Sequence, residues 1–264
     1  MSREQDAIVA HNREAWNREA RAGEIWSRPV DAGTVARARR GDFAVILTPT
    51  EPVPRDWFGA LAGARVLGLA SGGGQQMPVL AAAGARVTSF DLSDEQLALD
   101  AGVAAREGLA VHCVQGDMTR PLPFPDESFD LVFHPVSNLF VPDPVPVWRE
   151  CARVLRPGGA LLAGFMNPDW FVFDHDEAER SGEVRARYRL PYTEPDDLRG
   201  RDLQDWEEEG RQICFSHSMT AQLGGQLRAG LRIEGFYEDA WDPAVTPVAE
   251  WVPSAFATRA VRPG

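Results

Sequence analysis

The sequence predicts an α/β protein with a doubly wound, mostly parallel sheet. Strand-like apolar runs alternate with helical stretches from about residue 65 to residue 165, and this alternation is typical of βαβ units. The first run, Val66–Leu69, leads into a glycine-rich turn, and the second, Arg86–Phe90, leads to Asp91. Because ligands of such sheets bind beyond the carboxyl ends of the strands, we expect a site at this edge.

The glycine-rich turn and Asp91 indicate a nucleoside-containing cofactor. The backbone of Gly72-Gly73-Gly74 can approach a ligand closely because glycine has no Cβ, and Asp91 can accept both hydroxyls of a ribose. The turn does not match the G-x-G-x-x-G spacing of dinucleotide sites, and the chain has no G-x-x-x-x-G-K-[ST] loop and no lysine at all. A cofactor without phosphates therefore fits better.

The other elements follow from apolar periodicity and helix breakers. Ile8 and Trp16 lie at helix spacing, whereas the prolines in residues 46–55 exclude a regular helix. Ser93 is a suitable N-cap, with Gln96 at the capping-box position. Helices are predicted over residues 3–21, 32–40, 75–83, 93–107, 145–154 and 220–229. Strands are predicted over residues 66–69, 86–90, 110–114, 129–133, 160–165, 207–215, 231–237 and 254–261.

The motifs after Asp91 carry a family resemblance. They are Gly116-Asp117-Met118 after a strand, then the segment PLPFPDESFDLVFHPVSNLF, and after a helix RVLRPGGALLAGF. In this order, together with the glycine turn, they resemble the class I S-adenosylmethionine (SAM)-dependent methyltransferases. The resemblance is close over residues 65–165 and looser elsewhere. The segments SGGGQQ, HPVSNLFVPD and SHSMTAQLGGQL are similar to a bacterial subgroup of these enzymes.

The resemblance implies a single domain over residues 1–264 with a Rossmann-like, seven-stranded sheet that ends in an antiparallel hairpin. Helices within residues 1–55 are expected to form a lid over the cofactor. Residues 167–210 are charged, aromatic and proline-bearing, and we expect them to form a cap over the substrate after the fifth strand, because such insertions often set specificity. A solvated surface insertion is the alternative.

The resemblance also implies the residues that bind SAM. Gly72 and Gly74 occupy the second and third glycine positions of the family's first motif, and Ala70 replaces the first. Gly68 stands where the family usually has an acid that helps to hold the methionine amino group, so a nearby glutamine would compensate. The implied cofactor-binding residues are Gly68, Ala70, Gly72, Gly74, Gln75, Gln76, Asp91, Leu92, Asp117, Met118 and His134.

Two aspartates carry the nucleoside assignment. Asp91 matches the ribose-binding acid, and Leu92 would pack on the adenine. Asp117 matches the acid that accepts from the adenine amino group, and Met118 would supply a backbone N–H and an apolar wall. The structural alternatives are a helix-capping role for Asp91 and a turn-forming role for Asp117 next to Gly116.

His134 is the candidate catalytic residue because it follows the fourth parallel strand, which faces the methyl group in this fold. An unperturbed pKa near 6.5 suits a general base, although a lone His is more often structural. Methyl transfer by SAM is downhill, so proximity and an in-line approach are an alternative to a base. Ser137 and Asn138 are expected to orient the substrate or the methionine carboxylate.

Four aromatic residues complete the predicted site. Trp16 and Trp26 are candidates for the lid, and Trp16 is also a candidate substrate contact. Tyr188 and Tyr192 are candidate donors in the substrate pocket. No metal site is expected, because the adjacent residues Asp174-His175-Asp176 rarely converge on one ion.

Composition limits the partners. The formal net charge of −12 argues against a nucleic-acid partner, since phosphate contacts need a basic surface. No apolar signal region or 18-residue apolar run is present, so we expect a soluble, cytoplasmic protein without a membrane span. Cys113, Cys151 and Cys214 lack paired spacing, and Cys113 and Cys214 are expected to be buried thiols. A homodimer is left open.

The sequence thus predicts methyl transfer from SAM to a small molecule, at an acceptor atom (O, N, S or C) that it does not identify. One alternative is a module that senses SAM without chemistry. Another is a non-methylating enzyme that binds a modified SAM, which the glycine at position 68 leaves open. Methylation of tRNA or protein is disfavoured by the acidity and by H-P-V-S in place of an N-P-P-Y-type motif.

Overall fold

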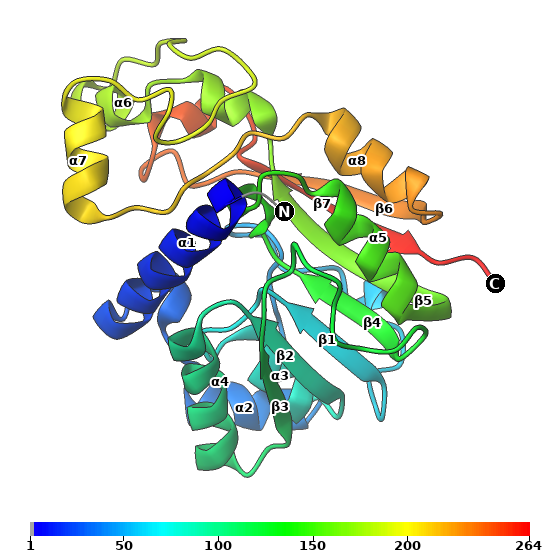
Figure 1. Ribbon diagram of the computed structural model, residues 1–264. Coiled ribbons are helices and arrows are strands. Elements are labelled where there is room, and N and C mark those ends of the chain that lie inside the picture. Colours follow the sequence, from blue (N-terminus) through cyan, green and yellow to red (C-terminus); the bar gives the residue numbers. More distant parts are fainter. Residues whose placement is uncertain (1–2) are drawn as a thin grey trace.

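The computed structural model describes residues 3–264, which contain a seven-stranded sheet between two layers of helices (Figure 1). The strand order is β3-β2-β1-β4-β5-β7-β6. Neighbouring strands among β1 to β5 pair in parallel, and β7 is antiparallel to both β5 and β6. The predicted fold is therefore confirmed. The strands are β1 (Arg65–Leu69), β2 (Arg86–Asp91), β3 (Val111–Gln115), β4 (Phe129–His134), β5 (Leu155–Met166), β6 (Arg232–Asp239) and β7 (Ala255–Val261).

Helices cover both faces of the sheet because alternate residues of the central strands are apolar on both sides. Val66 and Leu131 pack with α2 and α3 on one face, and Leu67 and Val132 pack with Trp148 of α5 on the other. Helix α8 lies against α5 on this second face. The helices are α1 (Arg3–Ala22), α2 (Ala32–Arg39), α3 (Gln76–Ala82), α4 (Asp94–Glu107), α5 (Val145–Val154), α6 (His175–Ser181), α7 (Arg201–Glu209) and α8 (Met219–Arg228).

Helix α1 lies across the carboxyl edge of the sheet and packs on α4. Ser93 caps α4 as predicted, since its Oγ accepts the Gln96 N–H at 3.0 Å. The same N-terminus holds α1: the Ser93 hydroxyl donates to Asn17 Oδ1, and the Asp94 carboxylate accepts from Arg13 and from the Asn17 amide. These hydrogen bonds hold α1 against α4, the helix that follows β2.

The segment between β5 and α8 contains α6 and α7 and has a small hydrophobic cluster of its own, made of Phe171, Tyr192, Leu198 and Trp206. The strand predicted over residues 207–215 is wrong. Helix α7 runs to Glu209 and ends at Gly210, whose φ is 63°. The next residues do not join the sheet, because Asn12 of α1 takes the Ile213 backbone: its Oδ1 accepts the N–H at 2.7 Å and its Nδ2 donates to the carbonyl at 3.1 Å.

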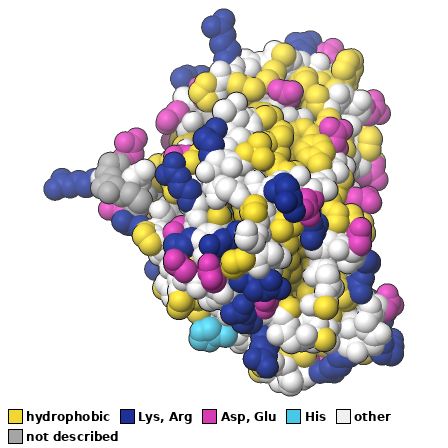
Figure 2. Space-filling model, turned by 90° about the vertical axis from the view of Figure 1, so that its right-hand side faces the viewer, with side chains coloured by type: hydrophobic (Ala, Val, Ile, Leu, Met, Phe, Trp, Pro, Cys, Tyr) yellow, Lys and Arg dark blue, Asp and Glu magenta, His cyan; other side chains and the backbone are white. Residues whose placement is uncertain are grey.

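The structure also describes the cysteines, the lengths of the helices and the surface of the protein. All three cysteines are free, but only Cys151 is fully buried, whereas Cys113 and Cys214 are half-buried. No helix within residues 3–264 is both long and apolar enough to cross a membrane. On the face shown in Figure 2, Arg side chains stand among Asp and Glu side chains, and hydrophobic side chains gather in the middle.

Candidate functional site

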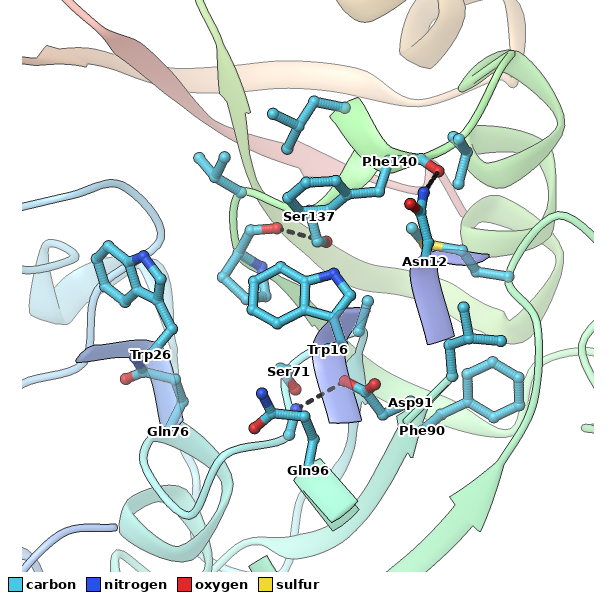
Figure 3. Close-up of a pocket in the computed structure, with 18 of the residues that line it drawn as sticks. Asn12, Trp16, Trp26, Ser71, Gln76, Phe90, Asp91, Gln96, Ser137 and Phe140 are labelled. Atoms are coloured by element: carbon cyan, nitrogen blue, oxygen red, sulfur yellow. Dashed lines mark hydrogen bonds between the residues drawn. The ribbon is translucent and has the colours of Figure 1, made fainter. Parts of the chain in front are cut away.

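A cavity of about 290 Å³ opens at the carboxyl ends of the parallel strands, where α1 covers the sheet (Figure 3). It lies at the topological switch between β1 and β4, as expected for an open α/β sheet. The cavity brings together most of the predicted site residues. These are Trp16, Trp26, Ala70, Gly72, Gln75, Gln76, Asp91, Leu92, Asp117, Met118 and Ser137.

Asp91, at the end of β2, joins the glycine turn to α4. Its Oδ2 accepts the Gly72 N–H at 3.0 Å, and its Oδ1 accepts the Ser93 N–H at 2.9 Å. Burial raises the pKa of this carboxyl, while the hydrogen bonds from backbone N–H groups oppose the rise. Both oxygens belong to a residue that lines the cavity, so the carboxylate is positioned to accept further hydrogen bonds from a ligand.

A second carboxyl, that of Asp100 in α4, binds the same glycine turn. The sequence patterns did not single out this residue as part of the site. Its Oδ1 accepts the Gly74 N–H at 2.8 Å, and its Oδ2 accepts from the Ser89 hydroxyl at 2.6 Å. Burial raises its pKa to about 7. A signal was present, because Asp100 lies on the apolar stripe of α4 between Leu97 and Val103, where a carboxyl needs a specific partner. Gly74 itself does not line the cavity.

Gly68 is buried in β1 and does not line the cavity. A Cβ at this position would lie 2.1 Å from Met77 Sδ and 2.3 Å from Ser71 Oγ. An acidic side chain therefore has no room here. The glutamines that could compensate bind the N-terminal segment instead: Gln75 Nε2 donates to the carbonyls of residues 25 and 28, and Gln76 Oε1 accepts from the Ile46 N–H.

Asp117 lies beyond β3, on the same side of β1 as Asp91. Its Oδ1 accepts the Thr119 N–H at 2.8 Å, and its Oδ2 accepts from the Thr119 hydroxyl at 2.8 Å. With Leu92 and Met118 it borders one end of the cavity. This end therefore combines a fixed carboxylate with two apolar side chains.

The N-terminal residues form much of the cavity roof. Trp16 of α1 stands edge-on to Phe140, with ring centroids 5.1 Å apart, and Trp26 lies 5.8 Å from Trp241. In Figure 3, Trp16 lies between Trp26 and Asp91. Asn12 fixes α1 over the loop after β4 by donating to the Phe140 carbonyl at 3.1 Å.

His134 is fully buried and does not line the cavity. Its ring packs edge-on against Trp148 of α5, and its Nδ1 lies 2.8 Å from the Leu69 carbonyl, so this nitrogen must carry the hydrogen. Nε2 is buried without a partner in the described residues. Burial lowers the pKa of the ring to about 4. The structure corrects the expectation that His134 lies next to an acceptor. Because side chains alternate between the two faces of the sheet along β4, this ring points toward the helix layer that contains α5.

Three other candidates also lie away from the cavity. Asn138 is buried and exchanges hydrogen bonds with Gln222 of α8 at 2.9 and 3.1 Å. Tyr188 and Tyr192 pack against each other inside the insertion, where the Tyr192 hydroxyl donates to Glu194. No residue between 167 and 240 lines the cavity, so the expected cap contacts α1 and not the cavity itself.

Two buried side-chain atoms of cavity-lining residues make no hydrogen bond within residues 3–264: Ser71 Oγ and Gln96 Oε1. Buried polar atoms are nearly always paired in folded proteins, so such atoms at a cavity wall indicate a polar ligand. Gln96 is held by its other end, since Nε2 donates to the Ser27 hydroxyl at 2.6 Å. The described residues contain no group of three or more His, Cys, Asp or Glu side chains that could hold a metal.

Comparisons with known proteins give the family and the fold of the chain. Residues 67–163 match the sequence model of a methyltransferase domain family. The chain is 44% identical to an uncharacterized methyltransferase, YbaJ of Bacillus subtilis, over 89% of this chain and 91% of the relative. It is also similar in structure to an S-adenosylmethionine-dependent methyltransferase from Mesorhizobium loti, with a TM-score of 0.61 and 20% identity over 79% of this chain and 95% of that chain.

Proposed function

The chain belongs to the class I SAM-dependent methyltransferases, and from this premise we propose that it transfers a methyl group from SAM to a small molecule, with both held in the cavity beneath α1. The observation that carries the proposal is the position of Asp91. Its carboxylate lines the cavity directly beside the glycine turn that it binds. A ribose at this point would donate its two hydroxyls to Asp91.

The residues around Asp91 fit the rest of a nucleoside. Leu92 and Met118 offer apolar surfaces for an adenine ring, and Asp117 offers a carboxylate that would accept from the adenine amino group. Ala70 and Gly72 leave the backbone of the turn open to the ligand. Asp100 acts as a positioning residue, because it holds Gly74 without touching the cavity.

The methionine end needs acceptors for an ammonium group, and residue 68 does not supply one. We propose that the unpaired Ser71 Oγ and Gln96 Oε1 take this role. Both line the cavity next to the turn, and Figure 3 shows both near Asp91. Oxygen atoms without a charge hold an ammonium less strongly than a carboxylate does.

Methyl transfer from SAM requires positioning by the protein and no catalytic side chain. SAM supplies an activated methyl group, and the lid with the strand-end loops holds the acceptor in line with it while excluding water. Ser137 lines the cavity, with its hydroxyl donating to the Pro135 carbonyl at 2.9 Å, so it remains a candidate for orienting the substrate. His134 has no part in this proposal because its ring does not reach the cavity.

Calorimetric titration with S-adenosylhomocysteine, SAM and NAD tests the proposal. We expect the two SAM-type ligands to bind with micromolar affinity and NAD not to bind, because the site offers no donor set for a pyrophosphate. Heat from NAD alone would contradict the proposal. Transfer of radioactive methyl groups from SAM into a small-molecule extract, but not into tRNA or protein, would then separate methylation from SAM sensing.

A further inference from the structure

The cavity has two halves that differ in chemistry. Asp91 and Asp117 follow β2 and β3, on one side of β1, whereas Val136 follows β4 and Met166 ends β5, on the other side. Figure 3 agrees with this order, since Asp91 and Trp26 lie at opposite sides of the cavity. The acceptor half, as we call it, is lined by Trp26, Ile46, Leu47, Thr48, Pro49, Pro135, Val136, Ser137, Met166 and Trp241.

The acceptor half contains no ionisable side chain. Among the described residues that line the whole cavity, the charged ones are Asp91 and Asp117, and both belong to the nucleoside half. A carboxylate, phosphate or ammonium group of a substrate would therefore lose its water here without gaining a counter-charge. Burial of an unpaired charge is strongly unfavourable.

The walls of the acceptor half suit a flat, apolar molecule. The indole rings of Trp26 and Trp241 are 5.8 Å apart and tilted by 53°, so that each presents a ring face or edge to the space beside it. Ile46, Leu47 and Met166 supply aliphatic surface. Two hydroxyl groups belong to this half: that of Thr48, beside Tyr237 and Asp239, and that of Ser137, which donates to the Pro135 carbonyl.

We propose that the acceptor is an uncharged, planar, largely apolar molecule that presents a hydroxyl or amino group, with its ring packed against the pair formed by Trp26 and Trp241 and its polar substituent near the hydroxyl of Thr48. This proposal rests on the proposed function, because it takes the other half of the cavity for SAM. It excludes acceptors whose recognition depends on a carboxylate, a phosphate or a fixed cation.

The transfer step is balanced without a side-chain base. A lone pair of the acceptor oxygen or nitrogen forms the new bond to the methyl carbon, while the bond from that carbon to the sulfonium sulfur breaks and leaves its electron pair on sulfur. The proton of the acceptor group passes to water, since no ionisable side chain lines this half. The products are the methylated acceptor, S-adenosylhomocysteine and a proton.

A matched pair of probes tests the proposal: 2-naphthol and 2-naphthoate have the same ring, but at neutral pH the first is neutral and the second is an anion. Each is titrated calorimetrically into the protein saturated with S-adenosylhomocysteine. We expect 2-naphthol to bind at least about tenfold more tightly than 2-naphthoate. Equal binding, tighter binding of 2-naphthoate, or binding of neither probe would overturn the inference.

Two variants locate the probe. Trp241→Ala should weaken 2-naphthol by about tenfold or more while leaving the affinity for S-adenosylhomocysteine unchanged. Met166→Lys places a cation in the acceptor half and should reverse the preference toward 2-naphthoate. Unchanged probe binding in a folded Trp241→Ala protein would overturn the inference. If S-adenosylhomocysteine itself does not bind the wild type, the proposed function fails first, and the two failures are thus distinguished.

Discussion

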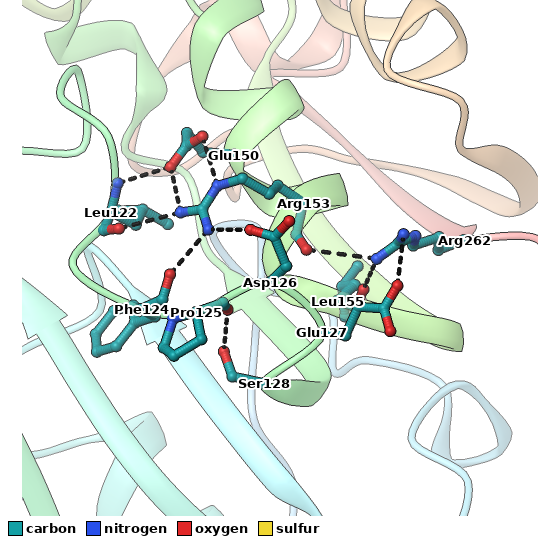
Figure 4. A network of polar contacts seen from close by, with 10 residues as sticks. All are labelled: Leu122, Phe124, Pro125, Asp126, Glu127, Ser128, Glu150, Arg153, Leu155 and Arg262. Atoms are coloured by element: carbon teal, nitrogen blue, oxygen red, sulfur yellow. Dashed lines mark hydrogen bonds and ion pairs between the residues drawn. The ribbon is translucent and has the colours of Figure 1, made fainter.

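The two ends of the parallel sheet use polar side chains in opposite ways. At the amino end, Arg153 donates to Glu150, to Asp126 and to two loop carbonyls, and Arg262 pairs with Glu127 (Figure 4). Nearby, Arg65 and Arg156 share the carboxylate of Asp130 and hold its pKa well below the usual range. At the carboxyl end, by contrast, the buried oxygens Ser71 Oγ and Gln96 Oε1 have no partner within residues 3–264.

This difference separates the groups that hold the fold from those that await a ligand. Where each donor has an acceptor, removal of one partner leaves the other unpaired, and stability falls. Where acceptors face a cavity without partners, their removal should cost affinity for a ligand and little stability. Four substitutions test this comparison, with the largest expected effect first.

His134→Ala should lower the free energy of unfolding by about 3 kcal/mol, because it removes a fully buried ring from its contact with Trp148 and leaves the Leu69 carbonyl unpaired. The affinity for S-adenosylhomocysteine should stay nearly unchanged. Urea unfolding and calorimetry measure the two effects, with His112→Ala, on the exposed side of β3, as control. Unchanged stability, combined with loss of a pH-dependent step in turnover, would restore the catalytic role.

Arg153→Ala should cost about 2–3 kcal/mol of stability, because Glu150 and the carbonyls of residues 122 and 124 lose a charged donor. Ligand affinity should not change, since the network lies at the other end of the sheet. Arg149→Ala on the same helix is the matched control, as this side chain is exposed. A loss of ligand affinity equal to the loss of stability would show that the two ends are coupled.

Asp91→Asn should weaken S-adenosylhomocysteine by about tenfold or more, because the hydrogen bonds from the ribose lose their charged acceptor. The stability of the free protein should fall as well, by about 1–3 kcal/mol, because the amide nitrogen of Asn cannot accept one of the two backbone N–H groups that Asp91 accepts. Asp56→Asn, at an exposed position, controls for net charge. Wild-type affinity in Asp91→Asn would mean that Asp91 is not the ribose ligand.

Asp100→Asn should have the smallest effect at slightly acidic pH, because the amide can keep both hydrogen bonds. Burial raises the pKa of Asp100 from 3.8 to about 7, so the folded protein holds a proton that the unfolded chain releases. This stabilising contribution is complete below about pH 4 and is lost as the pH rises through about 7. Urea unfolding across this range should show the loss in the wild type and not in the variant. The same slope in both would contradict the assignment.

The sequence predicted the sheet well, and it predicted that the glycine turn and Asp91 lie together at the carboxyl edge, because both depend on local signals. The apolar run before Gly72 and the acid after β2 mark their own positions, and strand order follows from right-handed crossovers. The orientation of His134 could not be predicted, since a strand residue at the end of β4 can face either helix layer. Residues 211–215 look like a strand, but their backbone binds Asn12, a partner about 200 residues away in the chain.

The positions of the two tyrosines of the insertion and of the acceptor-half residues could not be predicted from the sequence, for the same reason in both cases. Tyr188 and Tyr192 are apolar enough to form the separate cluster of the insertion, and no local pattern shows which side of that cluster the cavity lies on. The acceptor half likewise draws on residues from three distant parts of the chain, with Trp26 before the core, Met166 at its end and Trp241 after β6. Only the folded arrangement shows that these residues share a wall.

A crystal structure of the complex with S-adenosylhomocysteine tests the central claim most directly. We predict the ribose hydroxyls on Asp91, the adenine between Leu92 and Met118, and the sulfur directed toward the acceptor half lined by Trp26 and Met166. An adenosine group in the acceptor half, or a ligand bound outside the cavity beneath α1, would contradict the account.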